Sequence, residues 1–446
     1  MITKGCSKIK PDETIYANHR KTWTRMLPYA VSSVMLLHVP LQILLFNNIH
    51  IYIITLALFF LLIKNVFEGF KVKCGMLFAL VLILLSWIVM SGFMLPSILI
   101  PVIGAIDYLM PILFWSFYFS RFKNLFSILE FCRFLIIFGV FMALVGIYQR
   151  FIDPTLFGIL TIINPYYSKS TLEHVSVFRI SSFFSSTQTF SLYLGICVAL
   201  ILELWNNIDF GLLLQLSFLA VLTLGGLLAG GKVFIMLSGM SLIFLSIRKI
   251  KKNEFRIKKR FLITILFFVI VIFITFILFP EFVINIKEAI KTTTYRIFLF
   301  LFDQNTFYNQ ESIRIKAMKQ IFASDWQNII FGHGLGTASY SAFNTLSNKY
   351  FFTRFTSESY ILSWWYEMGI CGIITFMIFF CEIISRAFKK RAMTAITTLC
   401  LIISMFFVPT FYSVSMFPAW GILIFHYYNF DDASLKKILF KNLVSN

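Results

Sequence analysis

Four basic residues lie near the predicted outer ends of long apolar segments or in the predicted outer connections between them, and the positive-inside rule disfavours basic residues on short outer segments. They are Arg179, Lys232, Arg314 and Arg354. A guanidinium group presents a planar fork that matches phosphate oxygens, and an ammonium group presents a point charge. Singly, each is explained more simply by a side chain that extends to water or by a local ion pair. As a set, they predict a site for an anionic, phosphate-bearing headgroup.

Two carboxylates lie close together in the segment TSESYILSWWYEMGICG, residues 356–372. Glu358 can accept the proton of an attacking hydroxyl group, or it can simply cap the helix that begins there. Glu367 lies about two and a half helical turns further on, so we expect it to face the interior of a helix bundle and to pair there. Gly369 and Gly372 are expected to let neighbouring helices approach closely.

Other polar residues give weaker signals. Asp107 lies inside an apolar segment, where an ionisable group is either functional or the buried partner of one of the four cations. His333 lies in FGHGLG, residues 331–336, which predicts a tight structural turn rather than a phosphate-binding loop, because no βαβ pattern surrounds it. We expect Trp364 to lie near a membrane–water interface, where aromatic rings are favoured.

Apolar helices must position these residues. Of the 446 residues, 59% are hydrophobic and 13% are charged, whereas about a quarter of the residues of a soluble domain are charged. Apolar runs long enough to cross a bilayer recur along the chain. The sequence therefore predicts an all-α polytopic membrane protein with about twelve transmembrane helices, at 27–46, 49–67, 75–95, 98–119, 126–150, 187–204, 210–229, 232–247, 261–279, 359–385, 394–408 and 410–428.

The distribution of lysine and arginine predicts the orientation of these helices. Basic clusters follow most even-numbered spans, including RKIKKNEFRIKKR at 248–260. This places the N-terminal tail, 1–26, and the C-terminal tail, 429–446, in the cytoplasm. The net charge of +19 then reflects membrane insertion and anionic lipid headgroups rather than a nucleic-acid partner. The seven cysteines form no CxxC pair, which argues against a disulfide framework or a zinc site.

Two predicted outer connections are long. The first lies at about 151–186, within the block of predicted helices 1–9 (27–279). The second is 280–358, and it precedes predicted helices 10–12 (359–428). Such loops in compact proteins are usually functional or disordered. Residues 311–326 predict an amphipathic helix at the membrane interface. Its apolar face is expected to contain Ile313, Ala317, Met318, Ile321 and Phe322, with Arg314, Lys316 and Lys319 on other faces.

In their order, these motifs resemble the O-antigen ligase/polymerase superfamily, most closely the Wzy-type polysaccharide polymerases. The resemblance covers roughly residues 140–390 and rests on Arg179, the Gly-Gly-Lys hinge at Lys232, Arg314 with the GHGLG that follows, and the segment 356–372. It implies a GT-C-like fold and an inverting glycosyltransferase that needs neither a metal nor another cofactor. Undecaprenyl pyrophosphate would be bound by Arg179, Arg314 and Lys232. Arg354, which belongs to the same cationic set, would help to bind it.

The resemblance also assigns roles to the acidic segment. Glu358 would act as the base toward a sugar hydroxyl, and Arg314 would stabilise the departing pyrophosphate. Ligases of the superfamily resemble a pattern with His where this chain has Glu358, which favours a polymerase. The candidates for sugar contact or for supporting roles are Asp107, His333, Ser359, Trp364 and Glu367.

By the same resemblance, the protein is expected in the bacterial inner membrane, with 280–358 as a periplasmic loop, in O-antigen or lipopolysaccharide biosynthesis. Its partners would be lipid-linked oligosaccharide, the bilayer and a chain-length regulator protein. The alternatives are a ligase that transfers polymer to lipid A core or another acceptor, and a flippase or transporter of lipid-linked oligosaccharide. Transporters usually show internal repeats and polar groups near the midplane. Here no repeat is evident, and the polar groups gather at one face.

Overall fold

The computed structural model of the protein describes residues 11–37, 40–41, 57–58, 61, 76–153, 155–156, 180–184, 186–205, 207–208, 210–229, 232–251, 266, 270, 273–274, 277, 313–338, 355, 359–389, 392–407 and 414–428. Within these residues the protein is all-helical, and no strand is present among them. The predicted all-α class is confirmed for this part of the chain.

The helices, in chain order, are α1 (Pro11–Leu36), α4 (Met76–Met94), α5 (Leu99–Phe122), α6 (Ile128–Phe151), α9 (Thr187–Glu203), α10 (Leu212–Leu228), α11 (Lys232–Lys251), α15 (Ile313–Phe322), α16 (Trp326–Phe331), α18 (Tyr360–Lys389), α19 (Ala395–Ser404) and α20 (Phe417–Tyr428). Short 3-10 helices occupy Lys123–Leu125 and Val414–Met416. Most predicted spans coincide with a helix, whereas 49–67 and 261–279 lie largely outside the described residues. Helix α1 begins within the predicted polar tail, and Pro11 suits the first position of a helix.

Two helices, α6 and α18, are long and apolar enough to cross a membrane. A third span results if the two parts of α5, Leu99–Ala105 and Met110–Ser120, are taken together across a bend of 51°. Several shorter apolar helices, among them α9, α10 and α19, accompany them. The described part of the chain is therefore that of a membrane protein.

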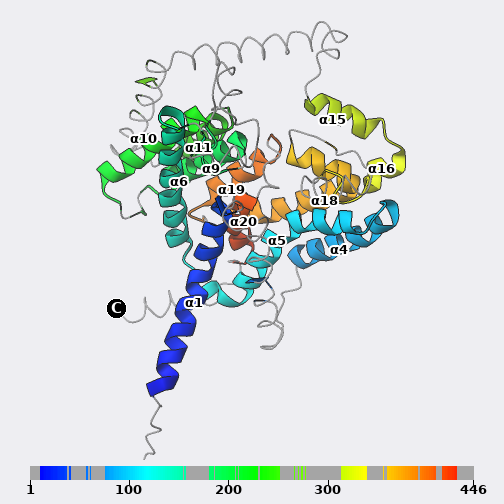
Figure 1. The fold of residues 1–446 in the computed structure, drawn as a ribbon, viewed down its shortest axis with the longest axis horizontal. Coiled ribbons are helices and arrows are strands. Elements are labelled where there is room, and N and C mark those ends of the chain that lie inside the picture. Colours follow the sequence, from blue (N-terminus) through cyan, green and yellow to red (C-terminus); the bar gives the residue numbers. More distant parts are fainter. Residues whose placement is uncertain are drawn as a thin grey trace, which may run out of the picture.

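Figure 1 shows α6, α9, α10 and α11 gathered on one side and α4, α5, α16 and α18 on the other, with α19 and α20 between them. Small residues let the first group pack tightly. A Cβ atom added at Gly139 of α6 would lie within 3.0 Å of the Cys197 side chain of α9, and one at Gly225 of α10 would lie as close to Ala143 of α6. Close helix approach of this kind is typical of membrane bundles.

Aromatic side chains connect the central helices to α5. The Trp115 ring of α5 packs against Phe131 of α6 and Phe417 of α20, with centroid distances of 5.3 and 5.5 Å. Its Nε1 donates a hydrogen bond to the Phe417 carbonyl oxygen at 3.0 Å, which satisfies the polar atom of a fully buried ring. These contacts hold α5 against α20 and α6.

A buried carboxylate joins three helices at one end of the bundle. Glu203, the last residue of α9, accepts hydrogen bonds from the N–H groups of Ile396 at 2.9 Å and Thr397 at 2.8 Å. Arg248, near the end of α11, lies 3.3 Å from the same carboxylate. The ends of α9 and α11 therefore meet the beginning of α19, so α19 extends from here toward the opposite end of the bundle.

Candidate functional site

Helices α16 and α18 touch backbone to backbone, and two glycines make this possible. Gly332, at the end of α16, has a φ of +84°, and Gly369 interrupts α18 with a φ of 63°. A Cβ atom at Gly332 would lie within 3.0 Å of the Glu367 carbonyl oxygen, and one at Gly369 would lie as close to the Ile330 carbonyl oxygen. Residues with a Cβ atom also rarely adopt a positive φ. The predicted use of Gly369 for close approach is confirmed.

Gly372 has a different role. A Cβ atom there would meet the side chain of Met368, on the same helix, rather than a neighbouring helix. The interruption at Gly369 folds Met368 toward the next turn of α18, and the missing side chain at Gly372 leaves room for it. The prediction that Gly372 serves approach by another helix is therefore wrong.

The Glu367 side chain holds the loop that follows α16. The residue is fully buried. Its Oε1 accepts the main-chain N–H groups of Gly336 at 3.0 Å and Ala338 at 2.7 Å, and its Oε2 accepts the hydroxyl group of Tyr108 from α5. These three hydrogen bonds tie the loop and α5 to the Glu367 carboxyl group. The prediction that Glu367 faces the bundle interior and is paired there is confirmed.

Loop 332–338 is also fixed against α4 and α5. The Leu335 N–H donates to Ser91 Oγ at 2.8 Å, and a Cβ atom at Gly336 would lie within 3.0 Å of the Ile100 carbonyl oxygen. The N–H groups of 333–336 and of Ala338 all donate to protein acceptors. They are therefore not a cradle for phosphate, and the predicted structural turn is confirmed.

His333 is held in one orientation on this turn. The His333 ring stacks on the Tyr366 ring, with centroids 4.0 Å apart. The Phe355 ring also stacks on the Tyr366 ring, with centroids 3.9 Å apart. The His333 Nδ1 lies 3.3 Å from the Tyr366 carbonyl oxygen. Its Nε2 lies 3.1 Å from Ser324 Oγ, whose own hydrogen is donated to the Gln320 carbonyl oxygen at 2.8 Å. Burial lowers the pKa of His333, which favours the neutral ring, and a neutral imidazole keeps one nitrogen that can accept a proton.

Ser359 and Trp364 lie in the protein interior. Ser359 is 2% exposed, and its Oγ accepts the Leu362 N–H at 3.4 Å in the first turn of α18. Trp364 is 1% exposed and packs edge-on against Tyr108 at 4.6 Å. Trp364 is thus enclosed by protein, because α18 enters the bundle at its first residue, where the Tyr360 N–H donates to the Met405 carbonyl oxygen. Trp364 therefore supports Tyr108 instead of presenting a face to a sugar. Its predicted place near the membrane–water interface stays a prediction.

The predicted amphipathic helix exists as α15, and it packs on α18. Ala317 and Ile321, each 2% exposed, form a cluster with Tyr366, while Lys316 is exposed as expected. The Arg314 side chain lies outside the described residues, so its place on another face of the helix stays a prediction.

The remaining predicted site residues fall at the edge of what the structure describes. Arg179, Arg354 and Glu358 lie outside the described residues, as do the side chains of Asp107 and Lys232. Their described neighbours are nevertheless informative, and they form two groups.

One group surrounds loop 332–338. The Phe355 N–H, next to position 354, donates to the Thr337 carbonyl oxygen at 3.0 Å, and Phe355 and α15 both pack on Tyr366. Ser359, next to position 358, directly precedes α18. Phe355 and α15 therefore converge on this loop, whereas positions 354 and 358 lie outside the described residues.

The second group lies at the hinge between α10 and α11. The Ile180 N–H, next to position 179, donates to the Leu228 carbonyl oxygen at 3.3 Å. Lys232, at the first position of α11, follows four residues later. Ile180 thus meets the end of α10, four residues before Lys232, whereas position 179 lies outside the described residues.

Tyr108 is the functional candidate that sequence reasoning missed. It lies at the bend of α5, next to Asp107, and its signal is a tyrosine beside an ionisable residue within an apolar helix. Its hydroxyl group reaches Glu367, which joins the bend of α5 to the interruption of α18. Among the residues described, no group of three or more His, Cys, Asp or Glu side chains could hold a metal ion.

Comparisons with protein-family models, with curated proteins and with solved structures find no match for this chain.

Proposed function

We propose that the chain is a polysaccharide polymerase of the bacterial inner membrane. In this proposal it is a GT-C-like glycosyltransferase of about twelve transmembrane helices with both termini in the cytoplasm. It transfers a growing glycan from undecaprenyl pyrophosphate onto a lipid-linked repeat unit at the periplasmic face, with inversion and without a metal.

The observation that carries the proposal is the convergence of separate motifs on loop 332–338. The GHGLG turn, helix α15 and the segment from Phe355 to Glu367 contact one another through Tyr366 and the Glu367 side chain. These are the motifs in the resemblance to the polymerases. Their contact supports one shared site, because a set of unrelated surface motifs has no reason to assemble around one buried carboxylate.

The proposed reaction uses charge stabilisation and one proton acceptor. The acceptor sugar hydroxyl attacks the anomeric carbon, the bond from that carbon to the pyrophosphate oxygen breaks, and the hydroxyl proton passes to the Glu358 carboxylate. Arg314 and Arg354 stabilise the negative charge that develops on the departing pyrophosphate. The second group, Arg179 and Lys232, suits the pyrophosphate of the other lipid-linked substrate, since a polymerase binds two such lipids.

Deletion of the gene, followed by electrophoresis of the surface polysaccharide, tests the function. A single repeat unit on the acceptor supports the polymerase. Loss of all attached glycan, with long polymer accumulating on the lipid carrier, identifies a ligase. Lipid-linked repeats retained on the cytoplasmic face identify a flippase and contradict the proposal.

Complementation with variants tests the residues. Glu358→Gln and Arg314→Gln should leave single repeats, because the first removes the base and the second a stabilising charge. Lys316→Gln, on the exposed side of α15, is the matched control and should restore long chains. Full chain length in the Arg314→Gln strain would exclude that arginine from the site.

A further inference from the structure

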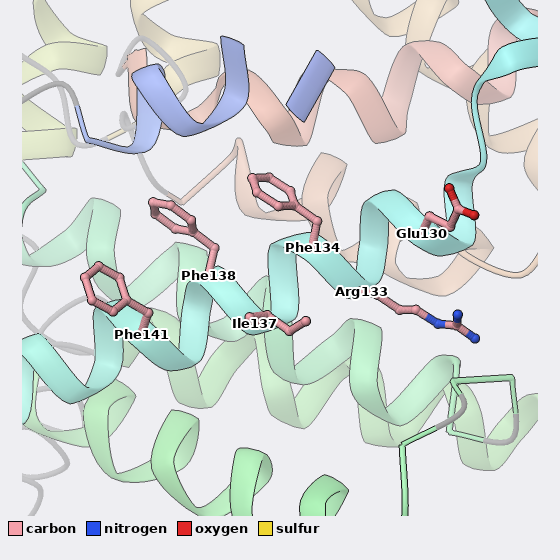
Figure 2. A pocket seen from close by; sticks show the side chains of 6 residues that line it. All are labelled: Glu130, Arg133, Phe134, Ile137, Phe138 and Phe141. Carbon is pink, nitrogen blue, oxygen red and sulfur yellow. The ribbon is translucent and has the colours of Figure 1, made fainter. Parts of the chain in front are cut away.

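Helix α6 changes its surroundings along its length. Near its beginning, Phe134 and Phe138 line an open apolar groove, which Figure 2 shows. Gln149 lies eleven residues after Phe138, close to three helical turns, and therefore on the same side of the helix. It is nevertheless fully buried. Another part of the chain must therefore cover this side of α6 near its end.

The irregular segment that precedes α9 provides this cover. The Gln149 Oε1 accepts the main-chain N–H groups of Ser181 at 3.0 Å and of Ser182 at 2.9 Å. Three residues earlier on α6, a Cβ atom at Gly146 would lie within 3.0 Å of the Ile180 side chain. The segment thus lies directly on α6, and one amide oxygen satisfies two of its buried N–H groups.

Segment 180–184 is strained as well as buried. Ser182 has a φ of 49°, which residues with a Cβ atom rarely adopt. Such a backbone conformation persists only where the surrounding contacts impose it, and it is found preferentially at functional sites. The Gln149 side chain supplies two of these contacts, one of them to the N–H group of Ser182 itself.

The same segment also reaches the hinge between α10 and α11. The Ile180 N–H donates to the Leu228 carbonyl oxygen at 3.3 Å. Consecutive Cα atoms are about 3.8 Å apart, so covalent geometry alone keeps Arg179 one such step from Ile180, and Lys232 within four such steps of Leu228. Gln149 therefore fixes the backbone from which one cation of the second group extends.

We propose that Gln149 is a positioning residue for the pyrophosphate site of Arg179 and Lys232, an inference that rests on the proposed function. Gln149 does not bind the substrate itself, because its oxygen already accepts two N–H groups. It holds segment 180–184 in its strained conformation, so that the guanidinium group of Arg179 is oriented before a phosphate arrives. A preorganised group binds more tightly because less conformational freedom is lost on binding.

A second buried glutamine offers a matched control. Gln215, near the beginning of α10, is 5% exposed, and its Nε2 donates to the carbonyl oxygens of Trp205 at 3.2 Å and Ile208 at 3.1 Å. It too holds an irregular segment, the one that follows α9. Because α10 ends at Leu228, the two glutamines act at opposite ends of that helix. Loss of either should lower stability, whereas only loss of Gln149 should affect pyrophosphate binding.

Binding of geranylgeranyl pyrophosphate to the purified full chain in nanodiscs tests the proposal, with geranylgeraniol as the ligand that lacks the phosphates. Gln149→Leu should bind the pyrophosphate about tenfold more weakly, the equivalent of one lost hydrogen bond to a charged group, and should bind the alcohol unchanged. Gln149→Asn, whose oxygen is withdrawn by one methylene group, should show a smaller loss and decides the matter if Gln149→Leu does not fold. Gln215→Leu should lower the unfolding midpoint comparably and leave both affinities unchanged.

Arg179→Gln and Lys232→Gln separate this proposal from the function on which it rests. If both bind the pyrophosphate as tightly as the unmodified chain, the site assigned in the proposed function is wrong. If they weaken binding while the Gln149 variants do not, the positioning role alone is overturned. Equal weakening in Gln149→Leu and Gln215→Leu would also overturn it, because binding would then follow overall stability.

Discussion

Two buried glutamates, Glu203 and Glu367, do similar structural work at opposite ends of the bundle. Each is almost completely enclosed, and each accepts two main-chain N–H groups from a distant segment. Glu203 holds the beginning of α19. Glu367, on α18, holds loop 332–338. The first N–H group of α18, that of Tyr360, donates to the carbonyl oxygen of Met405, which directly follows α19. The same chemical solution thus appears twice.

The difference lies in what each carboxylate holds. Glu203 binds the N-terminus of a regular helix, where free N–H groups and the helix dipole favour an anion, and Arg248 adds a cation. Glu367 binds an irregular loop, with Tyr108 as a further donor. That loop carries His333 and is bonded to Phe355. Glu203 thus joins helices, whereas Glu367 sets the position of a loop that carries an imidazole able to accept a proton.

Gly332→Ala should have the largest effect on the Glu367 end. The new Cβ atom would collide with the Glu367 carbonyl oxygen, and the backbone has positive φ. We expect a loss of about 4 kcal/mol or more, seen as a lowered midpoint of thermal unfolding by tryptophan fluorescence. Gly239→Ala in α11, with no atom within 4 Å, is the control and should be neutral or slightly stabilising. Equal midpoints for the two variants would contradict the backbone contact.

Replacement of each glutamate by glutamine should separate the two ends. Both oxygens of Glu203 accept N–H groups, so an amide –NH₂ must face a donor, at a cost of about 2–3 kcal/mol. At Glu367 the amide –NH₂ can face Tyr108, whose hydroxyl can accept as well as donate, so we expect a loss of about 1 kcal/mol. The midpoints of Glu203→Gln and Glu367→Gln in one detergent test this order. A larger loss for Glu367→Gln would contradict it.

The pH dependence of unfolding should report on His333. Its pKa in the folded protein lies below the ordinary value of about 6.5, so the unfolded chain binds the proton first as the pH falls. The stability associated with neutral His333 is present above about pH 6.5 and is lost as the pH falls toward the folded pKa. His333→Gln should therefore show a shallower decrease of the unfolding midpoint over this window. Identical pH profiles would show that His333 is not held neutral.

The exposed ion pair near the Glu203 end should have the smallest effect. The side chains of Arg25 and Glu130 are 54% and 42% exposed, so water and salt screen their attraction. Arg25→Gln should lower the unfolding midpoint only slightly, and high salt should remove the difference. Arg248→Gln should cost more and respond less to salt, because its partner Glu203 is enclosed.

The sequence by itself determined where helices form and which polar residues are enclosed by them. The apolar runs at 75–95 and 187–204 correspond to α4 and α9, since segments that are apolar along nearly their whole length must be buried or face lipid. It also predicted that Glu367 is buried and that FGHGLG is a turn.

Only the tertiary structure decided which segments meet. Nothing in the order of residues links Tyr108 to Glu367 or Thr337 to Phe355, because these contacts depend on how α5, α18 and the loop pack. Trp364 shows the same limit: its aromatic ring suits an interface, but the entry of α18 into the bundle buries it. Local composition determines helices, whereas hydrogen bonds between distant segments determine the site, and glycines allow the closest of these approaches, between α16 and α18.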